Sequence, residues 1–195
     1  LRVLAGIQAL SDSGVSCYYV AGNHDFWLGE LFSNTLGVKL VADSLILNRE
    51  SNPAERVLAA HGDGFGQGDL GYEILKKILR NSLLIRLFRL LHPDWGYALA
   101  RITSRASRKY TLNHQAGRIK ACAEVAQSLL AAYEDLDTVI LAHTHSPEQR
   151  QFDRGRYLNV GDWLTHFSYI VWSAPGEYEL KSFDYPSRQG CPPSR

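Results

Sequence analysis

The chain has 195 residues, which is enough for one domain of ordinary size with a sizeable core. Hydrophobic residues make up 45% of it and charged residues 21%, a composition that excludes a disordered tail and a fibrous repeat. The formal net charge of +1 gives no whole-molecule field for holding nucleic acid, so a general polyanion binder is also disfavoured.

The cysteines indicate the redox compartment of the protein, and the first residues indicate whether the sequence includes its natural start. Cys17, Cys122 and Cys191 are isolated and show no Cys-x-x-Cys spacing, which disfavours a disulfide framework and a thiolate zinc site and favours a reducing cytosol. The chain opens at Leu1 and contains no methionine, so we expect a natural start upstream. No apolar stretch approaches the ~20 residues of a spanning helix, and no leader pattern opens the chain.

Short helices and strands are expected in the first third of the chain. Apolar spacing predicts helices where the period is near 3.6, and short β-branched or aromatic runs predict strands. In chain order we expect a helix over residues 1–14, a strand over 15–21, a helix over 27–36 closed by Gly37, and strands over 38–42, 44–48 and 55–60.

From residue 69 to about residue 133 the apolar period becomes helical. Pro93 and Gly96 are expected to break this region into separate helices, with a longer helix over 112–133. Strands are then expected over 138–142, 148–152, 157–160, 167–172 and 177–183. The pattern predicts a mixed α/β fold with a helical insertion between two groups of strands.

Polar, ligand-type residues follow three of the predicted strands. The three junctions are Tyr18–Ala21 before Asn23-His24-Asp25, Val57–Ala60 before His61-Gly62-Asp63, and Val139–Ala142 before His143-Thr144-His145. Open α/β sheets place their sites at the carboxyl ends of the strands, so this recurrence predicts a functional site there.

The side chains at these junctions suit a divalent metal. Asn23, His61, His143 and His145 offer one amide oxygen and three imidazoles, which are donors for manganese, iron or zinc. His143 and His145 are two residues apart and would project to the same side of an extended segment. Gly62 would allow backbone and metal to approach closely. Any one of these residues alone could be an ordinary loop residue, but their joint occurrence favours a metal site.

These motifs resemble the second half of the calcineurin-like metallophosphoesterase pattern. The resemblance implies a four-layer α/β/β/α sandwich with a helical cap, and a two-metal phosphoester or pyrophosphate hydrolase. It implies that Asn23, His61 and His143 hold one divalent ion, for which we expect Mn²⁺, and that His145 contributes to a second ion. His24 would lie near the scissile phosphate as a charge stabiliser or proton donor.

Two further motifs of that family do not occur before the Asn-His-Asp segment. The family also uses Asp-x-His and Gly-Asp-x-x-Asp, whereas the only acid before Asp25 is Asp12 and no histidine precedes His24. A missing upstream segment is favoured over an evolved one-metal site. Ala142 also replaces the glycine usual before the histidine pair. We expect Asp25 and Asp63 to orient neighbouring histidines or backbone groups rather than to bind metal.

Within that superfamily the chain is similar to the UDP-2,3-diacylglucosamine pyrophosphatase branch. The likeness covers about residues 20–172 and rests on Asn23-His24-Asp25-Phe26 with Leu28-Gly29, His61-Gly62-Asp63 with Asp69 and Tyr72, Leu87-Phe88 with His92-Pro93, the segment 104–109, and Tyr157-Leu158-Asn159-Val160-Gly161-Asp162-Trp163. It implies hydrolysis of the substrate's pyrophosphate to UMP and an acylated sugar phosphate in lipid A synthesis, at the cytosolic face of the inner membrane.

Basic charge is concentrated in the predicted insertion. Residues 69–109 carry nine basic and three acidic side chains, a net charge of +6 against −5 for the rest of the chain. An apolar stripe with arginines could shelter acyl chains and attract anionic lipid. Alternatively, Leu83–Leu91 packs on the domain as an ordinary amphipathic helix. We expect one domain over 1–195, with a cap over 67–115 and a loose tail over 187–195.

Residues of the insertion are candidates for substrate binding. Asp69 and Tyr72 could bind the sugar, and for these and for the other candidates of the insertion solvated charge is the alternative. The candidates for hydroxyl and phosphate groups are Arg105, Ser107, Arg108 and Lys109. We expect His92, His114 and His166 to be structural, and Gly161-Asp162-Trp163 to form a turn with a packed indole.

Two other functions stay open. One is a soluble phosphodiesterase or phosphatase of the same superfamily, against which the apolar stripe argues. The other is a catalytically silent relative that binds lipid or protein through its cap, which the absent upstream carboxylates motivate.

Overall fold

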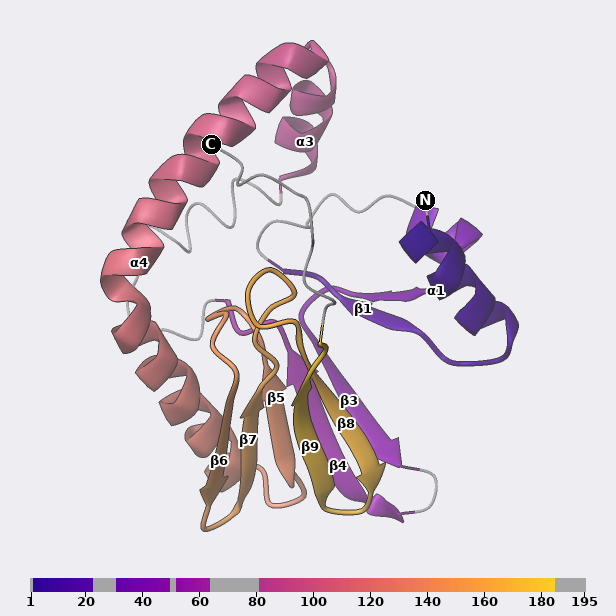
Figure 1. Cartoon of the computed structure of the whole chain (residues 1–195), viewed down its shortest axis with the longest axis vertical. Helices are drawn as coiled ribbons and strands as arrows, with labels where there is room; N and C mark the ends of the chain where they lie inside the picture. Colours follow the sequence, from indigo (N-terminus) through magenta and orange to yellow (C-terminus); the bar gives the residue numbers. More distant parts are fainter. Residues whose placement is uncertain (1, 23–30, 50–51, 64–80, 185–195) are drawn as a thin grey trace.

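The computed structural model describes residues 2–22, 31–49, 52–63 and 81–184 (Figure 1). Its elements are α1 (Arg2–Asp12), β1 (Tyr18–Val20), η1 (Leu31–Thr35), β2 (Lys39–Val41), β3 (Ser44–Arg49), β4 (Asn52–Ala60), α3 (Ser82–Arg89), α4 (Pro93–Ala132), β5 (Thr138–Leu141), β6 (Glu148–Phe152), β7 (Gly155–Asn159), β8 (Ser168–Ala174) and β9 (Glu177–Ser182). The predicted mixed α/β class is confirmed.

A mixed five-stranded sheet forms the centre of the fold. Its strand order is β3-β4-β5-β7-β6, with β4, β5 and β7 parallel and the outer strands β3 and β6 antiparallel to their neighbours. Parallel neighbours need a crossover connection, and the chain between β4 and β5 includes the long helix α4. β1 and β2 form a separate parallel pair, and β8 and β9 form an antiparallel hairpin.

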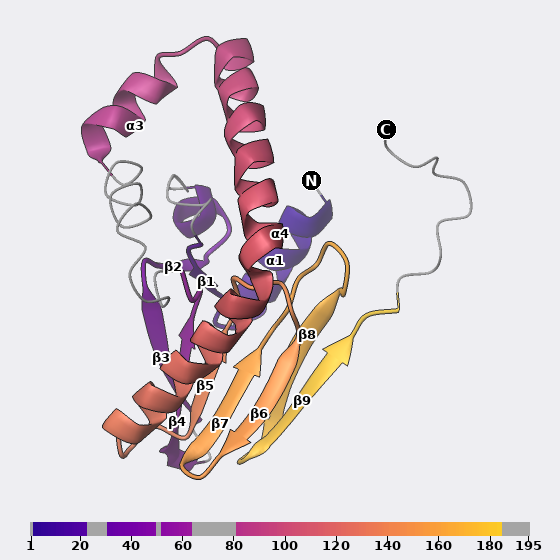
Figure 2. The same cartoon turned by 90° about the vertical axis from the view of Figure 1, so that its left-hand side faces the viewer.

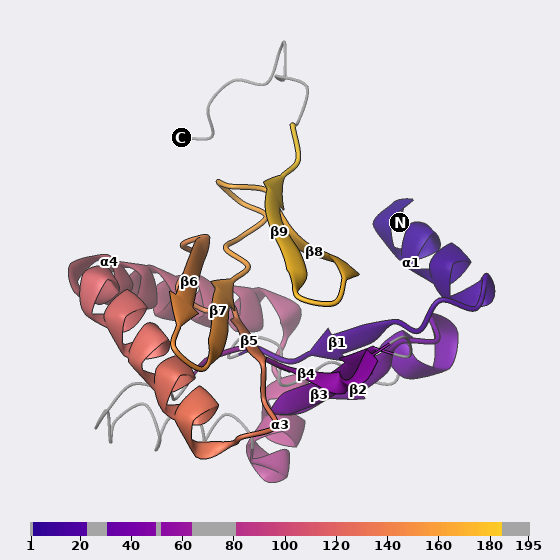
Figure 3. The ribbon, with the colours of Figure 1, turned by 90° about the horizontal axis from the view of Figure 1, so that it is seen from below.

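Both faces of the central sheet are covered, so its strands carry apolar side chains on each side. On one face the last turns of α4 bury Ala126 and Leu130 against Val139 and Tyr157. On the opposite face, buried Leu158 belongs to a cluster that includes side chains of β8 and β9. The described residues therefore form three layers, helix on sheet on sheet (Figure 3).

Helix α4 is continuous over 40 residues, so the predicted breaks at Gly96 and before residue 112 are wrong. Pro93 does separate α3 from α4, because it occupies the first turn of α4, where its missing N–H costs nothing. Gly96 lies one turn later, and its N–H already donates to the carbonyl of His92 at 3.1 Å. A glycine there lowers helix stability by about 1 kcal/mol but does not end the helix.

Helix α3 and the N-terminal half of α4 extend beyond the strands (Figures 1 and 2). Leu83, Leu87 and Leu90 of this segment are 62%, 51% and 82% exposed. The alternative in which Leu83–Leu91 packs on the domain is therefore wrong. Among the described residues, no helix has both the length and the apolar character that crossing a bilayer requires.

Element boundaries differ from the sequence expectation near the N-terminus. The strand expected over 15–21 contains only Tyr18–Val20, because its partner β2 offers just three residues for pairing. Residues 27–30 of the expected helix lie outside the described residues, and Leu31–Thr35 form a short π-helical turn. Gly37 follows with φ of 66°, the left-handed conformation expected for a glycine that closes a helix.

Candidate metal centre

Parallel pairing of β4 and β5 brings two of the predicted metal ligands together. Ala59 pairs with Ile140, so the residues that follow both strands emerge at one edge of the sheet. The ring centroids of His61 and His143 lie 5.0 Å apart, with an angle of 68° between the ring planes. Two imidazoles that bind one ion at about 2.1 Å place their centroids roughly 4.5–5 Å apart, so this pair has suitable spacing for a shared cation.

His61 is held in one orientation by Asp63. Its Nδ1 lies 3.0 Å from Oδ1 of Asp63, whose side chain is 7% exposed. A carboxylate can only accept, so Nδ1 carries the proton and Nε2 presents its lone pair. A carboxylate on the far nitrogen of a histidine is the usual support for a metal ligand. The predicted contact of Asp63 with a neighbouring histidine is therefore confirmed.

The backbone around His143 corrects the expectation of an extended segment. His143 and His145 have φ of 60° and 57°, and the N–H of Thr144 donates to the carbonyl of Ala142 at 2.7 Å. This is a γ-turn centred on His143, which is an uncommon and strained conformation. Strand alternation therefore does not set the direction of the two side chains, because the strand ends at Leu141.

Asn159 at the end of β7 supports this turn. Its side-chain nitrogen lies 2.8 Å from the carbonyl of Ala142, 3.0 Å from Oγ1 of Thr144 and 3.1 Å from the hydroxyl of Tyr157. Its carbonyl oxygen accepts the N–H of Gly161 at 3.0 Å. Asn159 is fully buried, so these contacts connect β7 to the loop that carries both histidines.

His143 contacts a cation from α4. The Arg118 guanidinium donates to Nε2 of His143, so the lone pair of this nitrogen is occupied. Burial is the largest influence on the imidazole, and the neighbouring charge of Arg118 adds to it, so the pKa of His143 is lowered to about 3. His143 is therefore a neutral acceptor at physiological pH.

His145 lies near a second carboxylate. Its Nδ1 is 3.8 Å from Oδ2 of Asp162, and Nδ1 of His166 lies 3.1 Å from the same oxygen. Burial alone would raise the pKa of Asp162, but backbone N–H donors from Thr165, His166 and Leu164 hold it well below its ordinary range. Asp162 is thus ionised, and it is more than the turn residue expected from the sequence.

Comparison with curated proteins gives consistent matches. A UDP-2,3-diacylglucosamine hydrolase from Aeromonas salmonicida (strain A449) is 32% identical over 183 residues, covering 92% of this chain and 70% of the relative. The chain belongs to the UDP-2,3-diacylglucosamine hydrolase family. Another member, from Stutzerimonas stutzeri (strain A1501), is 32% identical over 165 residues, or 83% of this chain and 67% of the relative. One from Pseudomonas putida (strain W619) is 29% identical over 187 residues, covering 94% and 76%. No protein-family model matches.

Membership of this metallophosphoesterase-type hydrolase family implies divalent metals. The donors among the described residues supply part of a site for one such ion. His61 and His143 are adjacent, and His61 already has the carboxylate support of a ligand. Within residues 2–22, 31–49, 52–63 and 81–184, no three His, Cys, Asp or Glu side chains converge closely enough to hold an ion. The pair offers two nitrogen donors, so further ligands are required to complete a site.

Several predicted site residues of this hydrolase family member cannot be placed. Asn23, His24, Asp69 and Tyr72 lie outside the described residues. Arg105, Ser107, Arg108 and Lys109 fall within α4, but only their backbone belongs to the described structure.

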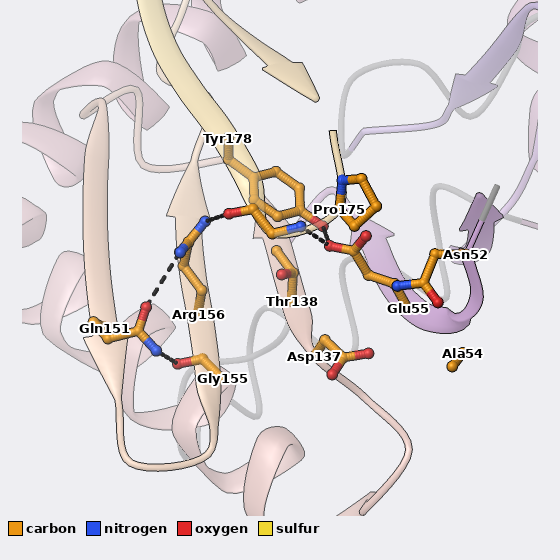
Figure 4. Close-up of a pocket in the computed structure, with 11 residues that line it drawn as sticks. Asn52, Ala54, Glu55, Asp137, Thr138, Gln151, Gly155, Arg156, Pro175 and Tyr178 are labelled. Atoms are coloured by element: carbon orange, nitrogen blue, oxygen red, sulfur yellow. Dashed lines mark hydrogen bonds between the residues drawn. The ribbon is translucent and has the colours of Figure 1, made fainter. Parts of the chain in front are cut away.

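A cavity of about 410 Å³ lies at the opposite end of the sheet (Figure 4). It is lined by the beginnings of β4 and β5 and by the turns of the β6–β7 and β8–β9 hairpins, with Glu55, Arg156 and Tyr178 among its residues. Glu55 accepts hydrogen bonds from the hydroxyl of Tyr178 at 2.9 Å and the N–H of Gly176 at 2.7 Å. These contacts join the hairpin to the sheet and include none of the predicted site residues.

Three residues beside the histidines of this family member were not assigned to the site from the sequence. Arg118 precedes His143 by 25 residues and belongs to no motif, so only the packing of α4 reveals it. Asn159 and Asp162 lie in the segment Tyr157–Trp163 that carried part of the family resemblance. The available signal was the strand end, because Asn159 is the last residue of β7 and Asp162 lies in the loop that follows.

Proposed function

We propose that this protein hydrolyses the diphosphate of UDP-2,3-diacylglucosamine to UMP and 2,3-diacylglucosamine 1-phosphate, a step of lipid A synthesis. The observation that carries the proposal is the match over 92% of the chain to a protein named for hydrolysis of that substrate. The adjacent rings of His61 and His143 support it, because they gather nitrogen donors at the edge of the sheet where such a site is expected.

We assign the metal ligands by the family resemblance. Asn23, His61 and His143 would hold one divalent ion and His145 would contribute to a second, with Mn²⁺ as the expected metal. When bound, the ions supply Lewis-acid activation of a phosphoryl group and of water. Asp63 fixes the tautomer of His61 through its 3.0 Å contact, so that Nε2 would be the nitrogen free to hold the ion.

Three residues of this chain act on the substrate or on the ligands in this proposal. His24 would stabilise charge on the scissile phosphate or donate a proton to the leaving group. Asp162 provides a fixed negative charge 3.8 Å from Nδ1 of His145. Asn159 holds the γ-turn that carries His143.

The finer architecture is also part of the proposal. The helix, sheet and hairpin layers support a four-layer α/β/β/α sandwich, in which the fourth layer would cover the outer face of the β8–β9 hairpin. We place a single domain over 1–195, a cap over 67–115 and a loose tail over 187–195.

The cap would bind the substrate at a membrane surface. Leu83, Leu87 and Leu90 are exposed on a segment that carries a net charge of +6, a combination that suits acyl chains and anionic lipid headgroups. The sugar and phosphate groups would be bound by Asp69, Tyr72, Arg105, Ser107, Arg108 and Lys109. We therefore propose peripheral association with the cytosolic face of the bacterial inner membrane.

Metal-dependent release of UMP tests the reaction. The purified protein is expected to release UMP from UDP-2,3-diacylglucosamine with Mn²⁺ and to lose this activity when EDTA removes the metal. Activity would be followed by chromatography of UMP. A protein that binds Mn²⁺ without cleaving this substrate would support the silent relative instead.

Vesicle flotation tests the membrane assignment. The protein is expected to float with vesicles that contain phosphatidylglycerol, and Leu87→Glu is expected to weaken this binding about tenfold or more, because the change forfeits the burial of one leucine. Leu10→Glu, which changes an exposed leucine on α1, is the matched control and should float like the parent. Equal flotation of all three proteins would contradict the assignment to α3.

A further inference from the structure

Arg118 lies on the face of α4 that is turned toward the strand ends. One turn earlier, Gln115 Nε2 lies 3.5 Å from Oγ of Ser146, in the same loop as His143. One turn later, Cys122 is buried in the core beneath the sheet. Positions 115, 118 and 122 share one helix face, so Arg118 is directed at the candidate metal centre rather than at open solvent.

The contact between Arg118 and His143 and the binding of a metal at His143 exclude each other. A neutral imidazole has one lone pair, and here it accepts an N–H of the guanidinium. A cation that binds this nitrogen must therefore displace Arg118. The guanidinium stays charged under all ordinary conditions, so after displacement it would lie beside a second positive charge unless an anion joins them.

An anionic substrate would supply that charge. We propose that Arg118 is a further catalytic residue that binds the diphosphate of the substrate in the metal-loaded enzyme, and that it occupies the free lone pair of His143 when metal is absent. Guanidinium groups bind phosphate oxygens in a bidentate manner, which adds both orientation and charge neutralisation. The identity of the substrate in this inference rests on the proposed function. The class of anion, a diphosphate, does not.

A purely structural role predicts a different result. If Arg118 only fastens α4 to the loop, its removal loosens His143 and lowers metal affinity. If Arg118 competes with the metal and then binds phosphate, its removal leaves metal affinity unchanged or increases it while anion binding becomes weaker. Metal affinity and anion affinity therefore change in different ways under the two roles.

The test compares Arg118→Gln and Arg118→Lys with the parent. Lys120→Gln is the matched control, because it removes one positive charge from the outer side of the same helix, where Lys120 pairs with Glu124. Mn²⁺ binding would be measured by electron paramagnetic resonance, binding of inorganic pyrophosphate to the Mn²⁺-loaded protein by calorimetry, and turnover by UMP release.

Arg118→Gln is expected to bind Mn²⁺ as tightly as the parent or up to about tenfold more tightly. Its pyrophosphate affinity should fall about 10- to 100-fold, and kcat/KM should fall by a similar factor, because a charge-assisted hydrogen bond is lost. Arg118→Lys should recover part of both losses, since it keeps the charge without the bidentate geometry. Lys120→Gln should behave like the parent.

Two outcomes would overturn the inference. One is a loss of Mn²⁺ affinity in Arg118→Gln, which would assign the residue a structural role. The other is unchanged pyrophosphate binding in that variant. Failure of the proposed function looks different: the parent would release no UMP, while pyrophosphate binding to the Mn²⁺-loaded protein would still depend on Arg118.

Discussion

Replacing His61 by alanine is expected to abolish Mn²⁺ binding at the His61–His143 pair and to reduce UMP release by about a thousandfold or more. The ring centroids of His61 and His143 lie 5.0 Å apart, and without His61 the remaining imidazole of the pair cannot retain a divalent ion. Electron paramagnetic resonance of Mn²⁺ and chromatography of UMP measure the two effects.

Two further variants make this experiment specific. Asp63→Asn keeps the size of the side chain but weakens the support of His61, so metal affinity should fall about 10- to 100-fold rather than vanish. His92→Ala removes an exposed histidine that caps α4, and it should leave Mn²⁺ affinity unchanged. If His61→Ala binds Mn²⁺ like the parent, the metal centre assigned here is wrong.

Strand ends were the part of the site that the sequence could predict. The apolar runs before His61 and His143 indicate buried strands, and parallel neighbours inevitably deliver the residues that follow them to one edge. The orienting role of Asp63 was also predictable, because it lies two residues from His61 and carboxylates commonly support metal-binding histidines.

Backbone conformation and long-range packing were not predictable from the same patterns. The γ-turn at His143 depends on the contact of Ala142 with Asn159, whose position is fixed only once β7 pairs with β5. Likewise, the pairing of Arg118 with His143 depends on α4 running unbroken to the sheet. The low helix propensity of Gly96 suggests a break, but the cap at His92 and Pro93 in the first turn start the helix before it.

The exposure of α3 could not be predicted from the sequence pattern either. The repeat of leucines predicts an amphipathic helix but does not say what its apolar face meets. The net charge of +6 over residues 69–109 favours a lipid-binding face over packing on the domain, but only in part. The exposed leucines of α3 show that this face does not pack on the domain.

Loss of Asn159 is expected to have the second large effect, because one buried side chain supports both the fold and the metal centre. Asn159→Leu leaves the carbonyl of Ala142, the hydroxyl of Thr144 and the N–H of Gly161 without these partners. Each buried group left unpaired costs about 1–3 kcal/mol, so for three groups we expect the free energy of unfolding to fall by about 3 kcal/mol or more. Urea denaturation of the metal-free protein measures this change.

Metal affinity should fall in the same variant, and this separates positioning from simple stability. The γ-turn at His143 costs about 1–3 kcal/mol of strain and persists only while its surroundings enforce it. Without Asn159 the turn can relax and move His143 away from His61, so Mn²⁺ should bind about tenfold or more weakly at a temperature where the variant is still folded. Thr138→Val is the matched control: Thr138 is also buried, but it lies at the other end of β5, so its loss should lower stability while Mn²⁺ affinity is retained. Parental Mn²⁺ affinity in folded Asn159→Leu would show that Asn159 supports the sheet alone.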